Sequence, residues 1–350
     1  MDFDLSKEQR ALQLAARTWF SQNWQAGNLR QVLDGQPLPD LRRPLAEMGF
    51  LSILTDGGAV LDLALVAEEA GRALAPAPLI GTAGRAVLLL QGAANAALLA
   101  AVTSGDVAVA VLDGPFSLAQ QNGSPVVSGT SEVALDLGAA QQLLLLIDAP
   151  GAPALVLVER GDRVLAVQRA PLDVSRDLGT VVLDAAPATV LLTGDAVLPL
   201  WGRARLVASV LLAAEDLGTI ERSLEMTVAY ANDRHTFGRS IGSYQAVKHA
   251  CVDAYVEQEL LRSLVWLAAW TADADPDNLP LYAAAARALA SSAVESVTES
   301  LIQIHGGIGF TWEHDAHLYW RRAKVDRLLL GGIAEHRDTV ARLALASVAR

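Results

Sequence analysis

The sequence is poor in cysteine and in positive charge, and each shortage excludes a class of protein. Its single cysteine, Cys251, cannot form a disulfide within the chain. With 27 lysines and arginines against 39 aspartates and glutamates, the formal net charge is -12, which repels nucleic acid and anionic lipid. Nucleic acid is therefore not an expected partner, although a few arginines in one cleft can still bind a nucleotide cofactor.

Targeting signals and long apolar runs are also missing. The start, MDFDLSKEQR, has neither the basic region nor the apolar run of a signal peptide. Apolar stretches such as residues 143–147 are far shorter than the roughly 20 residues that a membrane span requires. Hydrophobic residues nevertheless make up 52% of the 350 positions, enough to argue against disorder. We expect a globular, cytoplasmic protein of two or three packed units without a membrane segment.

The spacing of apolar residues divides the chain into three segments. Residues 1–104 repeat apolar positions at intervals of three and four, which predicts an N-terminal helical domain. Residues 105–196 contain short Val- and Leu-rich runs bounded by Gly, Pro and Asp, which predict a middle β-barrel or sandwich domain. Residues 197–350 return to long Ala-rich helical patterns, which predict a C-terminal four-helix-bundle-like domain. The expected fold class is α+β.

One island of polar and aromatic residues, at 234–249, lies between two long helical patterns. Two arginines, a phenylalanine and a glutamine in one loop suit a pyrophosphate and a heteroaromatic ring. Gly238 and Gly242 permit sharp turns, and Ser243 is expected to cap the following helix. On residue types alone, a surface loop of ion pairs is the simpler interpretation.

A second island, QIHGGIGFTWEH, covers residues 303–314. Its glycines let backbone approach a ligand closely, but they do not form the strand–turn–helix fingerprint of a dinucleotide fold. The pair His314 and His317 resembles metal-ligand spacing. We reject a metal site because helical zinc sites usually place two histidines at i and i+4 with a third ligand elsewhere. Asp315 is instead expected to be the N-cap of the next helix.

The two islands, in this order and about seventy residues apart, resemble the FAD-dependent acyl-CoA dehydrogenase family. The shared pattern is R-x-x-F-G followed by Q, then Q-x-x-G-G-x-G-F. The resemblance extends over the whole chain, because MDFDLSKEQRAL is similar to the opening helix of the family and VAEEAGRALAPAPL to the end of its helical domain. The family's order of helices, β domain and helices is the order expected here.

The resemblance implies a flavin site shared by two subunits. In the family, one chain holds FAD and its neighbour contacts the adenosine diphosphate half. The chemistry of the matching residues agrees, since they offer a fork for phosphate, an apolar wall, two neutral hydrogen-bonding amides and close backbone access. With the resemblance included, a cofactor site is preferred to a surface loop. The FAD-contact set expected here is Arg234, Phe237, Gln245, Gln303, Gly306 and Gly307.

The chain departs from the family at its catalytic base. The reaction removes a proton next to the thioester while a hydride leaves the adjacent carbon for the flavin. The positions at which members carry a Glu match Leu330 or, in some members, Ala208, and neither side chain can accept a proton. Nearby carboxylates, Glu215, Asp216 and Glu335, are interpreted first as structural. The catalytic residue is therefore unassigned.

A second departure lies in the β domain. Val133, Ala134 and Leu135 occupy the stretch that the family places against the flavin ring. Loss of the ring wall and the base, with the FAD-contact set kept, resembles the short subunit of heteromeric α2β2 acyl-CoA dehydrogenases, several of which act on steroid-CoA side chains. The implied partners are an acyl-CoA substrate, a homologous acyl-CoA dehydrogenase chain and an electron-transfer acceptor.

Two other interpretations stay open. One is a self-sufficient homo-oligomeric dehydrogenase with a relocated base, which would bind flavin when produced alone. The other is a flavin-free binding or scaffold protein that kept the fold without the chemistry, which would lack yellow colour with every partner.

Overall fold

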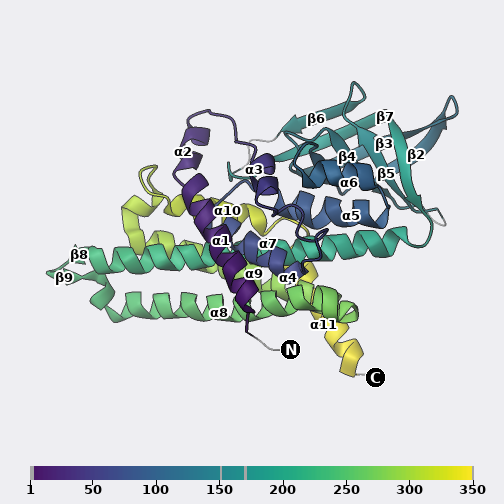
Figure 1. Ribbon diagram of the computed structural model, residues 1–350. Helices are drawn as coiled ribbons and strands as arrows, with labels where there is room; N and C mark the ends of the chain where they lie inside the picture. The colour runs from purple at the N-terminus through teal and green to yellow at the C-terminus, as the bar shows by residue number, and fades with distance from the viewer. Residues whose placement is uncertain (1–3, 150–151, 169–171, 349–350) are drawn as a thin grey trace. The chain divides into compact units, whose positions relative to one another are not determined.

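The computed structural model describes residues 4–149, 152–168 and 172–348 (Figure 1). The chain forms two compact units, each built from segments that are not contiguous in the sequence. The helical unit comprises Met1–Pro37, Val60–Ala75 and Ser209–Arg350, and the sheet unit comprises Leu38–Ala59 and Pro76–Ala208. Division into domains at 104/105 and 196/197 stays a prediction.

In the described part of the chain, the helical unit consists of helices and one short hairpin. Its first helix, α1 (Lys7–Asn23), begins with a capping box in which the side chains of Ser6 and Gln9 each accept a hydrogen bond from the other's backbone N–H. The remaining elements are α2 (Asn28–Leu33), α4 (Val60–Ala73), the C-terminal part of α7 (Val197–Asp233), β8 (His235–Thr236), β9 (Arg239–Ser240), η2 (Ile241–Ser243), α8 (Gln245–Ala274), η3 (Pro276–Asn278), α9 (Leu279–His305), η4 (Gly306–Phe310), α10 (Ala316–Asp326) and α11 (Ile333–Val348).

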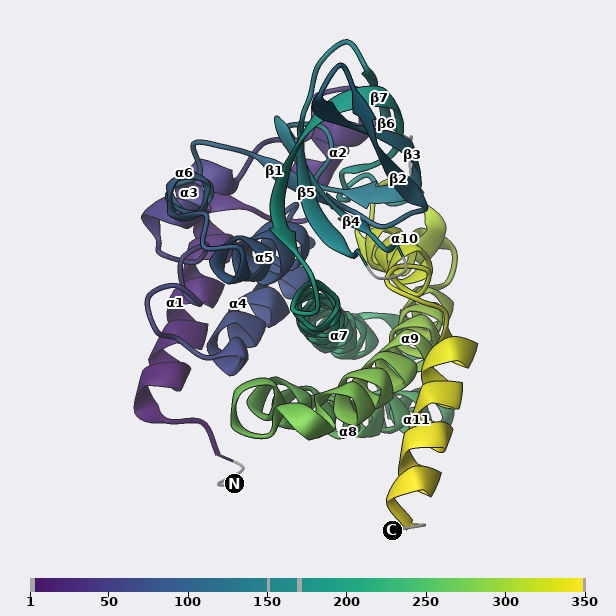
Figure 2. The ribbon, with the colours of Figure 1, turned by 90° about the vertical axis from the view of Figure 1, so that its right-hand side faces the viewer.

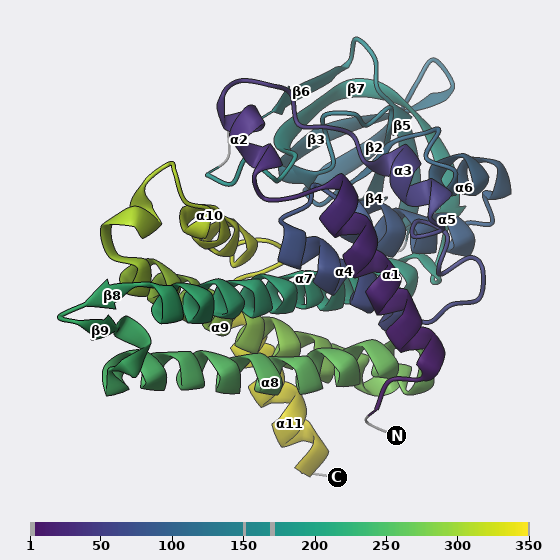
Figure 3. The same cartoon turned by 60° about the vertical axis from the view of Figure 1, so that its left-hand side comes forward.

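Two glycines allow α4 and α7 to lie in backbone contact. A Cβ on Gly218 would lie 1.8 Å from the carbonyl oxygen of Glu68, and one on Gly71 would lie 2.0 Å from that of Glu215. Any larger residue at either position would push the helices apart. On the other side of the bundle, α9 packs along α8 and also contacts α10 and α11 (Figure 3). The helical bundle predicted from the long Ala-rich patterns is confirmed.

The long helix α7 contains a stretch of 18 residues that is apolar enough to cross a membrane, with a mean hydropathy of 1.5. Of that stretch, 61% is buried inside the protein. A helix that is mostly buried against other elements is typical of a protein core, so length and composition alone are weak grounds for a membrane span.

The sheet unit contains one curled sheet and short helices (Figure 2). The strand order is β1-β4-β5-β7-β3-β2, with β6 also paired to β7. The curl runs through β7, whose C-terminal half pairs with β5 while its N-terminal half pairs with β3 and β6. The elements are α3 (Arg42–Glu47), the π-helix η1 (Leu79–Ala86), α5 (Val87–Gly92), α6 (Ala96–Thr103), β1 (Val109–Leu112), β2 (Phe116–Gln121), β3 (Ser124–Leu135), β4 (Gln142–Ile147), β5 (Ala154–Glu159), β6 (Val164–Gln168) and β7 (Leu178–Thr193).

Apolar side chains cover both faces of β4, which explains why its sequence is a continuous apolar run. Leu143 and Leu145 belong to the core enclosed by the curled sheet, whereas Leu144 packs with α5 in a second core. The α+β class predicted from the sequence is confirmed. One feature was not expected, since β1 and β4 pair in parallel while the other pairs of this sheet in the described chain are antiparallel.

Candidate functional site

All six residues of the FAD-contact set lie on the helical unit, and every one is exposed to solvent. They occupy two places, the connection between α7 and α8 and the end of α9. Arg234 follows α7, Phe237 lies at the tip of the β8–β9 hairpin, Gln245 begins α8, Gln303 lies in the last turn of α9, and Gly306 and Gly307 begin η4.

The β8–β9 hairpin projects beyond the ends of α7 and α8 (Figure 3), and its strands are joined by a two-residue turn. Both turn residues have positive φ, 53° at Phe237 and 78° at Gly238, as the I′ turns of tight hairpins require. A phenylalanine is strained in this conformation, and its side chain is 92% exposed. A strained backbone that holds an almost fully exposed apolar ring is unfavourable in an isolated chain. The arrangement points to a contact with another molecule.

The two arginines of the hairpin region have different roles. The guanidinium of Arg239 lies 3.9 Å from the ring centroid of Tyr244, and the Tyr244 hydroxyl donates to the Thr236 carbonyl at 3.2 Å. Arg239 therefore stabilises the hairpin. The Arg234 guanidinium has no ion-pair or hydrogen-bond partner among the described residues. Of the two arginines, it is the one left available for an anion.

One capping prediction is wrong. Ser243 lies inside η2, and its hydroxyl donates to the Ser240 carbonyl at 2.7 Å. The N-cap of α8 is Tyr244, without a side-chain hydrogen bond. Because the Ser243 hydroxyl is hydrogen-bonded within η2, it does not cap α8. Gly242 in this turn is required by space, since a Cβ there would lie 2.9 Å from the Ala231 carbonyl oxygen.

The glycine loop, Gly306–Phe310, ends α9 and offers open backbone. Gly306 has φ of 63°, which terminates the helix. A Cβ on Gly306 or Gly307 would meet no atom within 4 Å, so a ligand can approach the backbone here. Phe310 is 74% exposed. The loop thus presents bare peptide groups next to an exposed aromatic ring.

A stack of three rings joins the two places. The Tyr230 ring, on α7 one turn before Arg234, lies 4.3 Å from the His305 ring at an interplanar angle of 23°. The His305 ring lies 4.5 Å from that of His314. We call these three residues the ring stack. It joins the base of the hairpin to the end of α9. No sequence pattern predicted it, because Tyr230 is far from the two histidines in the chain.

His314 and His317, considered above for metal binding, contact different rings. His314 Nδ1 accepts a hydrogen bond from the Ala316 N–H at 3.1 Å, and His317 packs edge-on against Trp312 at 4.9 Å. Burial lowers the pKa of both histidines. The described residues contain no group of three His, Cys, Asp or Glu that could hold a metal ion.

Asp315 occupies the N-cap position of α10, as the sequence predicts, but its side chain does not cap the helix. Its Oδ1 accepts instead from the Arg30 guanidinium at 2.7 Å. The aspartate therefore ties the start of α10 to α2.

Leu330, the residue that the sequence resemblance matches to the family's base, lies in the loop after α10. Leu330 has φ of 58°, an uncommon conformation for a bulky residue, and its side chain cannot accept a proton. Glu335, in the first turn of α11, has its Oε2 3.0 Å from the position of a Cβ on Gly331. An exposed carboxylate without a cationic partner in the described chain thus lies beside the neighbour of Leu330.

The other two candidate carboxylates are enclosed in ion pairs. Glu215 Oε2 lies 3.3 Å from Arg322 Nη1, and Asp216 Oδ2 accepts from Arg287 Nη1 at 2.6 Å. All four side chains have no exposed surface. Arg287 also donates to the Asp326 carbonyl at 2.9 Å. These pairs hold α7 against α9 and α10, which agrees with the structural interpretation made from the sequence.

On the sheet unit, the ring-facing stretch ends strand β3. Val133 is 53% exposed, whereas Ala134 is fully buried. The register of β3 with β7 shifts between Ser131 and Ala134. This bulge interrupts the alternation of side chains between the two faces of the sheet. Val133 therefore presents a small aliphatic side chain at the surface.

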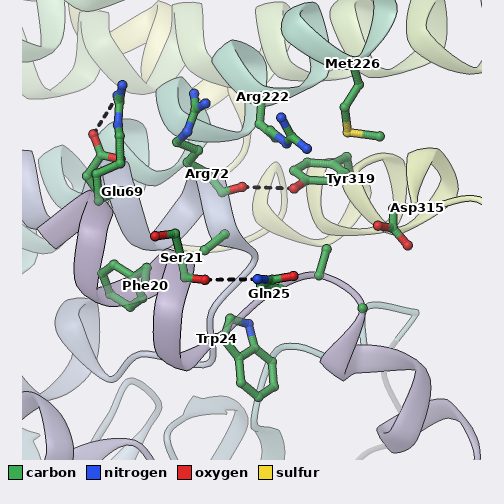
Figure 4. Close-up of a pocket in the computed structure, with 14 residues that line it drawn as sticks. Phe20, Ser21, Trp24, Gln25, Glu69, Arg72, Arg222, Met226, Asp315 and Tyr319 are labelled. Carbon is green, nitrogen blue, oxygen red and sulfur yellow. Dashed lines mark hydrogen bonds and ion pairs between the residues drawn. The ribbon is translucent and has the colours of Figure 1, made fainter. Parts of the chain in front are cut away.

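A cavity of about 550 Å³ opens within the helical unit, lined by the end of α1 together with parts of α4, α7 and α10 (Figure 4). None of the FAD-contact set lines it. Arg17 binds Glu69 through two hydrogen bonds of 2.9 Å, and the Tyr319 hydroxyl donates to the Arg72 carbonyl at 2.9 Å. The labelled lining residues are Phe20, Ser21, Trp24, Gln25, Glu69, Arg72, Arg222, Met226, Asp315 and Tyr319.

Glu68, the neighbour of the cavity-lining Glu69 on α4, is 1% exposed. Burial, together with the nearby Glu221 carboxylate, raises the pKa of Glu68 to about 8. The nearest cation is Arg262, at 4.0 Å, too far for a hydrogen bond. Glu68 is therefore largely protonated at neutral pH.

Comparison with known proteins agrees with this geometry. The sequence pattern of the acyl-CoA dehydrogenase C-terminal domain matches residues 207–345. Acyl-CoA dehydrogenase IpdE2 of Mycolicibacterium smegmatis is 34% identical over 275 residues, which cover 79% of this chain and 76% of that protein.

Two solved structures have the same fold over nearly the whole chain. The ChsE4-ChsE5 complex from Mycobacterium tuberculosis superposes with a TM-score of 0.89 at 25% identity, covering 98% of each chain. The Tcur3481-Tcur3483 steroid ACAD superposes with a TM-score of 0.87 at 28% identity, covering 98% of this chain and 99% of that one. The extent and identity of the match to IpdE2, with the same fold in both structures, show that this chain belongs to the FAD-dependent acyl-CoA dehydrogenase family.

Proposed function

We propose that this chain is the subunit of a hetero-oligomeric acyl-CoA dehydrogenase that contacts the FAD of its partner and contributes no catalytic base. The reaction is the α,β-dehydrogenation of an acyl-CoA thioester. One observation carries the proposal: the helical unit keeps an exposed FAD-contact set in which the Arg234 guanidinium has no partner among the described residues, while leucine and alanine occupy positions 330 and 208. A chain with this combination can bind a cofactor without performing the proton transfer.

The residues fit the adenosine diphosphate half of FAD. The Arg234 guanidinium, which has no partner in the described part of the chain, is available for the pyrophosphate. Gln245 and Gln303 are exposed carboxamides for hydroxyl or base edges, and the open backbone of Gly306 and Gly307 gives close approach. The exposed Phe237 ring supplies an apolar wall. FAD, when bound, supplies the hydride acceptor, and this chain's residues hold and orient its distant half.

The partner is a homologous chain that carries the base and the ring wall. Two comparisons support an assembly of unlike chains. ChsE4-ChsE5 is a complex, and the Tcur3481-Tcur3483 enzyme is likewise named after two components. The latter is a steroid enzyme, which favours the CoA thioester of a bulky steroid-derived acyl group as the substrate. Electrons then pass to a separate electron-transfer acceptor.

A second candidate, the self-sufficient dehydrogenase, is favoured by Glu335. Of the three carboxylates considered, Glu335 is the one without a cationic partner in the described chain, and its Oε2 lies beside Gly331. A base moved from position 330 to position 335 could reach the same substrate carbon only if the loop between them brings it there. Its exposure to solvent makes it equally well suited to the first turn of a helix, where acids are stabilised.

The test is the colour of the protein. The tagged chain is produced alone and also purified from its native host together with any chain that accompanies it, and flavin absorbance is recorded for both samples. We expect a colourless chain alone and a yellow complex with a second acyl-CoA dehydrogenase chain. A yellow, active chain alone would support the relocated base, and a colourless complex would support the flavin-free alternative.

A further inference from the structure

The ring stack has a defined protonation pattern. His305 Nδ1 lies 2.7 Å from the Leu301 carbonyl oxygen, so this nitrogen carries the proton and donates it. The other nitrogen, Nε2, then carries a lone pair. It is buried and has no hydrogen-bond partner in the described part of the chain. His305 as a whole is 3% exposed.

The groups around this imidazole make protonation costly. The Tyr230 ring on α7 stacks on the imidazole at 23°, and the His314 ring lies 4.5 Å away at 49°. The charges near His314 are those of the ion-paired Asp315 and Arg30. Among the described residues no carboxylate contacts the His305 ring. A proton on Nε2 would therefore create a buried cation without an acceptor. Stacking of that cation on Tyr230 would recover only part of the cost, because a cation–π contact is weaker than the penalty for an unpaired buried ion.

The same ring is the contact between the two halves of the FAD-contact set. Tyr230 lies one turn before Arg234 on α7, and His305 lies between Gln303 and Gly306. Separation of Tyr230 from His305 would free the hairpin from the glycine loop. Burial also lowers the pKa of His305, opposed in part by its bond to Leu301 and reinforced by His314.

We propose that the ring stack is a pH-sensitive latch that positions the hairpin against the glycine loop, closed while His305 is neutral and opened when it is protonated. His305 is thus a positioning residue. It contacts no cofactor, but its charge sets the spacing of the groups that do. The proposal deepens the proposed function and rests on it wherever FAD is mentioned; the latch motion itself involves only this chain.

Two substitutions separate stacking from titration. His305→Phe keeps a ring between Tyr230 and His314 but cannot be protonated. His305→Asn keeps a donor for the Leu301 carbonyl but loses the stack. The first variant should remain closed at all pH values, and the second should be open at all pH values.

The first measurement is backbone hydrogen exchange of the tagged chain in its co-purified complex, at about pH 7.5 and about pH 5.5, corrected for intrinsic rates. In the wild type, acidification should increase opening of residues 235–240 and 306–310 by up to about tenfold, because about pH 5.5 lies about one unit below the ordinary pKa of a solvated imidazole, which the open state has, whereas burial lowers the pKa of the closed state. His305→Phe should show no increase, and His305→Asn should be open at both values. Equal opening of the wild type and His305→Phe on acidification would overturn the latch.

The second measurement is release of FAD fluorescence from the same samples. Wild-type complex should lose flavin as the pH falls, while His305→Phe should retain it. Identical release curves for the two proteins would contradict the latch but leave the proposed function standing, because flavin was bound at neutral pH. If no sample holds flavin at any pH, the proposed function fails, and the exchange measurement still decides the latch.

Discussion

Two regions of the helical unit, the FAD-contact set and the loop at Leu330, differ in the functional groups that they present. The first has an unpaired guanidinium, an exposed ring at a strained hairpin tip and open glycine backbone. The second has a leucine in a left-handed conformation, at the position that the sequence resemblance matches to the family's base. Because both lie on one compact unit, general decay of the chain does not explain the difference. The difference supports the proposed subunit, which would contact a cofactor and leave the proton transfer to another chain.

The contrast between the two regions would be wrong if a buried carboxylate were the catalytic base. Asp216→Ala tests this and should have the largest effect on stability of the variants considered. Removing one partner of the buried pair leaves the Arg287 charge uncompensated, at a cost of about 3 to 5 kcal/mol of unfolding free energy. Denaturant unfolding measures it. Asp277→Ala, at an exposed aspartate on the same unit, should change stability by less than about 0.5 kcal/mol. Normal stability with loss of turnover for Asp216→Ala would make Asp216 catalytic.

The FAD-contact set is tested by Arg234→Ala. Loss of a charge-assisted contact to phosphate should weaken FAD binding to the assembled protein by about 1.5 to 3 kcal/mol. A flavin titration of the apo-complex measures the change. Arg337→Ala removes another exposed arginine of the helical unit and should leave the affinity as it was. Equal affinities for wild type and Arg234→Ala would remove Arg234 from the site.

Glu68 is a buried acid whose raised pKa suits a general base, so it too must be separated from the chemistry. The folded chain keeps a proton that the unfolded chain releases above pH 4.5. The stability from this proton is complete below pH 4.5 and is lost as the pH rises to about 8.

Glu68→Gln carries no such proton, so it should be more stable than wild type at pH 8 by about 1 to 3 kcal/mol, with unchanged turnover. Thermal unfolding between pH 5 and pH 8 gives the two slopes. Glu159→Gln, at an exposed glutamate, should keep the wild-type slope. A loss of turnover in Glu68→Gln, with its stability gained as expected, would assign Glu68 to the reaction.

The smallest effect is expected at Glu335. If this half-site is inert, Glu335→Gln should leave turnover of the complex within about tenfold, whereas loss of a true base costs about 10²-fold or more. Steady-state kinetics with the acyl-CoA substrate decide between the two. Asp338→Asn, one turn further along α11, is the matched control. A hundredfold loss of turnover confined to Glu335→Gln would show that this chain supplies the catalytic base.

Much of the fold could be predicted because its signals are local. The Ala-rich periodicity of α7, α8 and α9 and the Val- and Leu-rich runs of β4 and β5 each lie within one element. The hairpin of β2 and β3 was missed because its strands are polar, although the turn at Asn122 and Gly123, with φ of 51° and 80°, is a strong local signal.

The site was predictable only in part. Its exposed members lie in two motifs that can be read in the sequence, whereas the ring stack joins Tyr230 to residues more than seventy positions away. The pairs of Glu215 with Arg322 and Asp216 with Arg287 are likewise formed by tertiary packing. Ser243 was given a capping role because propensity does not reveal the short turn that precedes α8.

The most direct test of the central claim is the mass of the purified assembly by light scattering, measured together with the number of flavins per chain. The subunit proposed here should be found with an unlike homologous chain, with one FAD for each unlike pair, and the chain produced alone should carry almost no flavin. A stable homo-oligomer with one FAD in every chain, oxidising an acyl-CoA unaided, would contradict the claim.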